Sequence, residues 1–407
     1  MNNINFQKHW KNVQLKEIAS LRRESIQPEN DLCLNYVGLE HIDSGESQLK
    51  RWGNASEVKS TKNRFYADDI LYGKLRAYLD KAVIAEMEGI CSTDILVVTA
   101  NSKTIPRFLV YLLHTQPLIS HAVATSTGVN HPRTSWNSLG EFTLALPPLP
   151  EQRAIAHVLQ TLQEAKSARQ HEIALERERK AALMDHLFSH GTKGESRKQT
   201  EIGEIPKSWK VVQTGKVGKI VTGNTPKTSV PEYYGGPYMF ISPGDISEPQ
   251  YVTETNKYVS AEGLKVLRPL PRDSVLVVCI GSTIGKTAMT STEQSATNQQ
   301  INAIIPNAKA FSHYVYYAVT YRSRSLPALA GRAAVPIVKK SSFAKFLIPF
   351  PPLCEQHTIA QVLQTIDERI MALGKEVQHL EELFHAMLDE LMTGKRSAVP
   401  LIEDGGV

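Results

Sequence analysis

The 407-residue chain has only four cysteines, and Cys33, Cys91, Cys279 and Cys354 lie far apart in sequence. A structural zinc site needs closely spaced cysteines or histidines, and a disulfide scaffold needs many cysteines in a short chain. Neither pattern occurs, so we expect no metal site in this chain. A reducing compartment, the cytoplasm, fits this cysteine usage.

Long apolar runs are also missing. No segment approaches the roughly 18 consecutive apolar residues that a membrane-spanning helix requires. The first residues, Met1-Asn2-Asn3-Ile4-Asn5, lack the charged and apolar regions of a signal peptide. We therefore expect a cytoplasmic protein with no membrane partner.

Familiar catalytic patterns are absent or incomplete. Gly281–Lys286 resembles a phosphate loop, but it has three residues between its glycines where that motif has four. The alternative is a glycine-rich turn that presents Lys286. His186 and His190 have a zinc-like spacing without a third ligand. We find no adenine-methyltransferase tetrapeptide, no glycine-rich cofactor fingerprint and no Ser-His-Asp grouping. The chain is therefore predicted to be non-catalytic and to hold no cofactor of its own.

The net charge of +5 is unevenly distributed. Residues 200–350 carry 17 basic and 9 acidic side chains, or +8, whereas residues 351–407 carry 4 and 10, or −6. Residues 1–146 (16 and 15) and 147–199 (9 and 7) are close to neutral. Residues 200–350 have the positive charge expected of a surface that meets a polyanion, whereas residues 1–146 do not show it by charge alone.

One stretch occurs twice. Residues 147–161 and 351–365 are identical at 11 of 15 positions without a gap. Each copy opens with two prolines, which end the preceding element, and then places Glu151 or Glu355 in the first turn of a helix, where the helix dipole favours a negative charge. An internal repeat of this kind predicts a duplicated architecture.

The second copy continues as a heptad pattern typical of a helix that pairs with another helix. Its apolar positions alternate in steps of three and four: Leu363, Ile366, Ile370, Leu373, Val377, Leu380, Phe384, Met387 and Leu391. Gly394 follows as the expected C-cap. The first copy is the obvious partner.

The first copy is less regular. Lys166, Arg169, Glu176 and Lys180 stand where apolar residues are expected. A second stripe through Ala165, Ala168, Leu175 and Ala182 overlaps the first, so the register of this helix stays open. The alternative to pairing is that each helix packs only on its own domain.

The segments around the helices repeat one plan at low identity. We expect an α+β protein with two similar mixed α/β domains, at residues 1–146 and 200–350. Residues 147–199 would hold the first spacer helix and a linker, and residues 351–407 the second helix and a tail. The two helices are expected to pack as an antiparallel coiled coil with a pseudo-twofold axis and to act as a rod of fixed length.

This combination resembles the specificity subunits of type I restriction-modification systems over essentially the whole chain. The sharpest marks are the proline motifs Leu146–Gln152 and Pro351–Gln356 at the start of long helices. A second mark is Thr225-Pro226, then Tyr233–Tyr238, then Asp245-Ile246, which is similar to the start of that family's target-recognition domains. The first domain lacks the tyrosine–glycine stretch, so its target is expected to differ.

The resemblance implies a function. Each globular domain would read one half of a bipartite double-stranded DNA target, and the helices would set the spacer between the halves. Two methyltransferase subunits would dock on the helices, and motor-nuclease subunits would join them. S-adenosylmethionine, ATP and magnesium would then belong to these partners.

Candidate DNA-contacting residues lie on predicted loops, where Arg and Asn suit guanine and adenine edges and Lys suits phosphate. They are Lys74, Arg76, Asn130, His131, Arg133, Lys227, Tyr233, Lys286, Arg332, Lys339 and Lys340. For any one of them, a solvated surface position is the simpler interpretation. Candidate spacer and partner positions are Pro147, Pro148, Leu149, Glu151, Gln152, Leu159, Pro351, Pro352, Leu353, Glu355, Gln356, Leu363, Ile370 and Val377.

Two other functions stay open. The chain could be a non-catalytic scaffold whose paired helices organise other proteins, or an enzyme with an unrecognised site. Phosphate contacts give an affinity that falls steeply with salt, so a salt-titrated DNA-binding assay separates the scaffold from the DNA reader.

Overall fold

The structure is a computed structural model, and it describes residues 9–28, 34–247, 250–331, 334–398 and 400. The chain divides into two compact units. Unit 1 comprises Met1–Ala168 and Glu376–Val407, and unit 2 comprises Arg169–Lys375. Each long helix therefore contributes one part to each unit.

Unit 1 is built on short strands and helices. Its four-stranded sheet has the order β2 (Ala19–Leu21), β10 (Ile95–Ala100), β7 (Ile70–Gly73), β8 (Ala82–Ile84). Its five-stranded sheet has the order β3 (Ser25–Ile26), β6 (Lys62–Phe65), β9 (Gly89–Cys91), β4 (Asn35–Val37), β5 (Gly53–Asn54). β1 (Lys11–Gln14) pairs with β11 (Thr143–Leu146), and the helices are α1 (Pro106–Leu113), α2 (Gln116–Ala124) and α3 (Trp136–Gly140).

Unit 2 has the corresponding sheets. The five-stranded sheet has the order β15 (Gly218–Thr222), β22 (Ile301–Pro306), β19 (Val275–Val278), β20 (Thr287–Thr290), β17 (Tyr251–Val252). The three-stranded sheet has the order β18 (Tyr258–Val259), β16 (Tyr234–Ile241), β21 (Ser295–Thr297). β12 (Arg197–Thr200) pairs with β13 (Gly203–Pro206), and β14 (Lys210–Gln213) with β23 (Leu347–Phe350). The short helices are α5 (Thr214–Val217), α6 (Ala261–Lys265), α7 (Ser312–Arg322) and α8 (Lys340–Ala344).

The two units share a common scaffold. β7 pairs antiparallel with β8 and β10, and β19 pairs antiparallel with β20 and β22. These central strands are fully buried in both units, which explains their runs of branched apolar residues. The expected repetition of a mixed α/β plan is confirmed.

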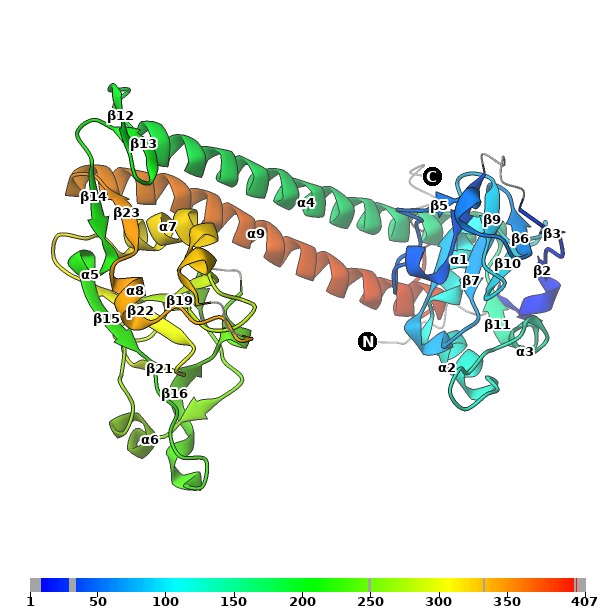
Figure 1. Cartoon of the computed structure of the whole chain (residues 1–407). Helices are drawn as coiled ribbons and strands as arrows, with labels where there is room; N and C mark the ends of the chain where they lie inside the picture. Colours follow the sequence, from blue (N-terminus) through cyan, green and yellow to red (C-terminus); the bar gives the residue numbers. More distant parts are fainter. Residues whose placement is uncertain (1–8, 29–33, 248–249, 332–333, 399, 401–407) are drawn as a thin grey trace. The chain divides into compact units, whose positions relative to one another are not determined.

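The two long helices are α4 (Leu149–His190) and α9 (Leu353–Met392), and Figure 1 shows them side by side. At 1.5 Å per residue they are about 63 and 60 Å long. Gly394 has a φ of 65° and its N–H bonds to the carbonyl of Leu391, as expected for a C-cap.

Each helix start is fixed by a buried glutamine. Gln152 accepts from the hydroxyl of Thr104 at 3.0 Å and the N–H of Ile105 at 3.1 Å, and it donates to the carbonyls of Lys103 and Pro147. Gln356 makes the equivalent bonds in unit 2, accepting from the Phe311 N–H and donating to the carbonyls of Lys309 and Pro351. The repeated motif is thus a clamp that joins the helix to the main chain of its unit.

Both helices contribute to both cores. In unit 1, Phe384, Leu388 and Leu391 of α9 belong to the same core cluster as Leu159 of α4 and the buried face of α1. In unit 2, Leu187 and Phe188 of α4 lie in one cluster with Leu363 of α9. The antiparallel pairing is therefore confirmed, and the alternative in which each helix packs only on its own domain is wrong.

The structure also decides the register of α4. Lys166 and Glu176 are only 5% and 6% exposed, whereas Leu175, on the competing stripe, is 50% exposed. Three of the four polar residues that interrupt the heptad pattern, Lys166, Glu176 and Lys180, therefore face α9, whereas Arg169 is exposed and pairs with Glu172 of its own helix. Their partners are Glu381 for Lys166, Arg369 for Glu176 and Asp367 for Lys180.

Among the residues that the structure describes, no helix is both long and apolar enough to cross a membrane.

Candidate nucleic-acid interface

Two loops of unit 1 meet beyond the end of β7. We call residues 74–80 and 127–134 the paired loops of unit 1. This arrangement brings all five sequence-predicted residues of the first domain together: Lys74, Arg76, Asn130, His131 and Arg133. The contacts between the loops are the Arg76 N–H to the Pro132 carbonyl (2.8 Å), the Thr134 N–H to the Lys74 carbonyl (3.0 Å), and a bridge between Leu75 and Arg133.

The five side chains differ in availability. Arg133 holds Asp94 in a two-pronged ion pair, with Nε–Oδ1 at 2.8 Å and Nη2–Oδ2 at 3.2 Å. The hydrogen bond from Arg133 holds the pKa of the Asp94 carboxyl below its usual value, against the effect of burial. Arg76, Asn130 and His131 are exposed, and Lys74 is half-buried. Arg133 therefore braces the loops, and the other polar groups remain available.

Unit 2 repeats this backbone arrangement. We call residues 279–286 and 334–340 the paired loops of unit 2. The Gly281 N–H donates to the Pro336 carbonyl at 3.0 Å, and Ile280 bridges to Ile337. The side chains differ, because exposed Val335 and Ile337 stand where unit 1 has His131 and Arg133. The same scaffold therefore presents mainly polar groups in unit 1 and more apolar groups in unit 2.

The candidates of the second domain fall into two groups. Lys286, Lys339 and Lys340 are exposed on the paired loops of unit 2 and at the start of α8. The position predicted at Arg332 lies outside the described residues. Lys286 makes a long contact, 3.5 Å, to the carbonyl of Ile246.

Lys227 and Tyr233 come from a different segment, which precedes β16. Lys227 is exposed, and Tyr233 is half-buried beside α6, where its carbonyl accepts from the Ser260 N–H. Tyr234 packs in the core cluster of β16 and donates its hydroxyl hydrogen to the Pro226 carbonyl at 2.9 Å. Tyr234 therefore supports the scaffold.

The model of one protein family matches the chain twice. This family is described as the type I restriction modification DNA specificity domain, and the matches cover residues 7–177 and 206–382. The chain belongs to this family. The two matches fall on the two repeats, which share their proline motif, glutamine clamp and loop scaffold.

Known relatives agree with this assignment. The chain is 26% identical over 413 residues to a candidate MjaX type I restriction enzyme specificity subunit of Methanocaldococcus jannaschii, covering 95% of this chain and 93% of that protein. It is 30% identical to the HindI specificity subunit of Haemophilus influenzae over 196 residues, or 47% of this chain and 42% of that protein.

Solved structures show the same fold. The type I restriction-modification S subunit of M. genitalium matches with a TM-score of 0.63 at 13% identity, covering 96% of this chain and 97% of that one. A chain from a study of complex assembly and conformational transition in the type I system matches with a TM-score of 0.59 at 20% identity, covering 95% and 98%. The fold of this specificity-domain protein is therefore a known one.

The predicted spacer positions lie at the two helix starts and along the seam. Glu151 accepts from the Trp10 indole N–H at 2.9 Å, and Glu355 accepts from Thr192, so both carboxylates hold the helix start to its unit. The exposed or half-buried members are Pro148, Leu149, Pro352, Leu353, Ile370 and Val377, and the buried ones are Pro147, Glu151, Gln152, Leu159, Pro351, Glu355, Gln356 and Leu363.

The segments with incomplete catalytic patterns have structural roles. Gly281–Lys286 lies in the turn between the paired strands β19 and β20, with no helix after it, so it lacks the strand-to-helix context of a phosphate loop. The His186 and His190 rings stack with centroids 4.7 Å apart. No group of three metal-ligating side chains occurs among the described residues.

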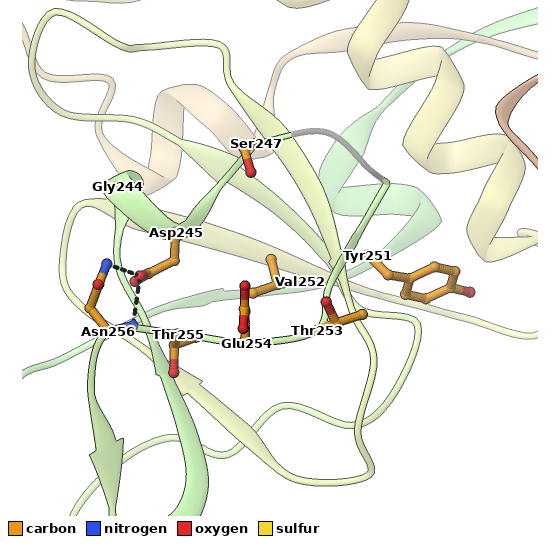
Figure 2. A pocket seen from close by; sticks show the side chains of 9 residues that line it. All are labelled: Gly244, Asp245, Ser247, Tyr251, Val252, Thr253, Glu254, Thr255 and Asn256. Carbon is orange, nitrogen blue, oxygen red and sulfur yellow. Dashed lines mark hydrogen bonds between the residues drawn. The ribbon is translucent and has the colours of Figure 1, made fainter. Parts of the chain in front are cut away.

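Sequence reasoning missed a polar pocket of about 430 Å³ in unit 2 (Figure 2). Asp245 receives hydrogen bonds there from the N–H and amide groups of Asn256, at 3.0 and 2.7 Å, and from Ser242. The wall also carries Glu254. Among the described residues, two carboxylates and no cation line this pocket, so it does not suit phosphate. The sequence signal was Asp245 itself, in the Asp245-Ile246 pair that follows the tyrosine–glycine stretch.

Proposed function

We propose that the chain is the DNA-reading subunit of a type I restriction-modification complex, with each unit contacting one half of a bipartite duplex site through its paired loops. The observation that carries this proposal is the repeated loop scaffold with unlike side chains. A shared backbone can dock on DNA in one way while different side chains read different base edges. The excess of basic residues in 200–350 supports the same function through phosphate attraction.

The helices set the distance between the half-sites in this proposal. α4 and α9 each run through both units, and their seam is fixed by ion pairs as well as apolar contacts. A helix pair of this kind resists slipping because a shift in register separates every ion pair at once. The base pairs between the half-sites would then remain unread.

Partner subunits would bind the outer faces of the same helices. Leu175 and Met371 in unit 2 are 50% and 42% exposed and Leu383 in unit 1 is 47% exposed, so the helices offer apolar side chains to a protein partner in each unit. We assign this surface to two methyltransferase subunits, with motor-nuclease subunits joining that core. S-adenosylmethionine, ATP and magnesium would be bound by these partners, and the chain itself would be non-catalytic.

Footprinting of the assembled complex tests this function. We expect two short protected half-sites with an unread spacer, and an affinity that falls steeply as salt rises. A single continuous site would contradict the proposal. Binding that ignores salt would favour the protein-interaction scaffold instead. Methylation or cleavage of DNA by the purified chain alone, with magnesium and S-adenosylmethionine, would contradict its non-catalytic role.

A further inference from the structure

Arg76 has an unusual backbone conformation. Its φ and ψ are 55° and 62°, in the left-handed region. This conformation is unfavourable for an L-residue with a Cβ atom, and it is routine only for glycine and, less often, asparagine or aspartate. Two hydrogen bonds hold it in place, from the Arg76 N–H to the Pro132 carbonyl and from the Leu79 N–H to the Arg76 carbonyl, both at 2.8 Å.

The equivalent position of unit 2 is Gly281. Its N–H bonds to the Pro336 carbonyl as that of Arg76 bonds to Pro132, and its φ is 96°. The scaffold therefore requires a left-handed residue at this point in both units. Glycine meets the requirement without strain, whereas unit 1 carries an arginine in spite of it. Strain retained in this way indicates a function for the side chain.

The Arg76 guanidinium is also available. Arg76 is exposed, and no described residue is recorded as a hydrogen-bond or ion-pair partner of its side chain. Arg133 on the facing loop is instead engaged, since it is paired with Asp94. Exposed Asn130 and His131 lie on the facing loop. The paired loops of unit 1 thus present one free guanidinium from a fixed backbone.

We propose that Arg76 reads a guanine in the half-site contacted by unit 1. The planar guanidinium can donate two hydrogen bonds to O6 and N7 of guanine in the major groove. A base edge requires a side chain whose backbone is held in place, whereas a phosphate is served equally well by the flexible side chain of a lysine. The inference rests on the proposed function, because it assumes that these loops contact DNA.

The decisive variant is Arg76→Gly in the full chain, assembled with its partner subunits. Glycine relieves the strain and removes the guanidinium, so folding should be unchanged or improved. We expect preference at one base pair of one half-site to fall by about tenfold or more, measured by competition between duplexes with that half-site randomised. The other half-site and the spacer should not change. Asp68→Gly is the matched control, because exposed Asp68 is also left-handed, with a φ of 69°.

The outcomes separate the two proposals. If the wild-type complex shows no bipartite site, the proposed function fails. If it shows one and Arg76→Gly leaves every base preference intact, only the guanine inference is overturned. An equal loss on all sequences together with a weaker salt dependence would assign Arg76 to phosphate and would also overturn it. Arg76→Lys should lose most of the preference, since an ammonium lacks the two-pronged geometry.

Discussion

The ammonium nitrogen of Lys166 on α4 lies 2.7 Å from Oε2 of Glu381 on α9. Glu46 contributes a second carboxylate at 3.0 Å. Burial acts to lower the pKa of Lys166, but the hydrogen bonds to Glu381 and Glu46 outweigh it and hold that pKa above its usual value. The equivalent position of the other helix is the half-buried Ile370. One seam position is therefore ionic in α4 and apolar in α9.

Replacing Lys166 with alanine should destabilise the protein. The substitution leaves Glu46 without one of its two cations and Glu381 without its lysine, and it opens space beside the seam. We expect a loss of about 2 kcal/mol in the free energy of unfolding, below the range for fully buried pairs because Glu381 is partly exposed. Urea denaturation measures it. Lys166→Ile, which fills the volume but carries no charge, is the control, and full recovery of stability in that variant would show that the charge is unimportant.

A second pair of equivalent sites predicts the effect of a double substitution. In unit 1, the Tyr111 hydroxyl bonds to Gln163 at 3.0 Å and its ring meets Phe384. In unit 2, Tyr317 bonds to Asp367 at 2.6 Å, and Lys180 pairs with that carboxylate and lies over the ring. The positions correspond one to one. Replacing Asp367 and Lys180 of unit 2 with the neutral residues found in unit 1, Gln and Phe, should therefore be tolerated.

Lys180→Phe alone should cost about 2 kcal/mol, because Asp367 loses its cation. Lys180→Phe with Asp367→Gln copies the unit 1 arrangement and should recover most of that loss. A double-mutant cycle in urea measures the coupling between the two positions. Simple additivity of the two single losses would contradict the proposed equivalence.

The repeat and the α9 heptads were enough to predict the duplicated fold and the antiparallel pairing. The register of α4 was not predictable, because Lys166 and Glu176 look misplaced until the fold supplies their partners. Glu46 is 120 residues from Lys166 in sequence, and no local pattern connects them. Charged residues within a heptad pattern therefore gave the wrong impression of a broken seam.

The candidate site was predicted in part. The five loop residues of unit 1 do lie together, because backbone hydrogen bonds join residues 74–80 to residues 127–134. The sequence could not show that Arg133 is occupied by Asp94, which is 39 residues away. It did contain a signal for Arg76, since the matching position of the second repeat is a glycine. That signal became interpretable only when the backbone hydrogen bonds fixed the alignment.

The glutamine clamps predict a local loss of stability. Gln152→Ala leaves the Ile105 N–H and the Lys103 and Pro147 carbonyls without their side-chain partner in a buried place. We expect the free energy of unfolding to fall by about 2–4 kcal/mol, and to fall by a similar amount in Gln356→Ala. Gln160→Ala is a matched control, because its bond to Glu164 is exposed. A control as harmful as Gln152→Ala would show that the clamp is not special.

Acid should weaken the pocket of unit 2. Burial acts to raise the pKa of Asp245, but hydrogen bonds from Ser242 and Asn256 outweigh it and leave that pKa below its usual value. Because the pKa of this carboxyl is lower in the folded than in the unfolded protein, the ionised carboxylate stabilises the folded state. This stabilisation is complete above the pKa of the unfolded state, near 4, and is lost as pH falls through the lower pKa of the folded state. Asp245→Asn should therefore reduce the pH dependence of unfolding below pH 4. If the stability of Asp245→Asn falls with acid as steeply as that of the wild type, Asp245 is not a source of the acid sensitivity.

Lengthening both helices should lengthen the spacer. Seven residues inserted after Ala168 in α4 and after Gln378 in α9 preserve the heptads and add about 10 Å to each helix. At 3.4 Å per base pair, this corresponds to about three more base pairs between the half-sites. Methylome sequencing measures both half-sites and spacer. Altered half-site sequences or an unchanged spacer would contradict the proposal that the helices set the spacer length. Insertion into α4 alone should destabilise the protein, since it separates Lys180 from Asp367.

The clamp at each helix start has a consequence for variation among such proteins. Gln152 and Gln356 bind mainly main-chain N–H and carbonyl groups, and among the described residues Thr104 alone contributes a side chain. Other sequences offer the same backbone groups, so the glutamine clamp tolerates extensive substitution in the domain attached to the helix. New target preferences can then arise through exchanged loops while the attachment to the rod is inherited unchanged.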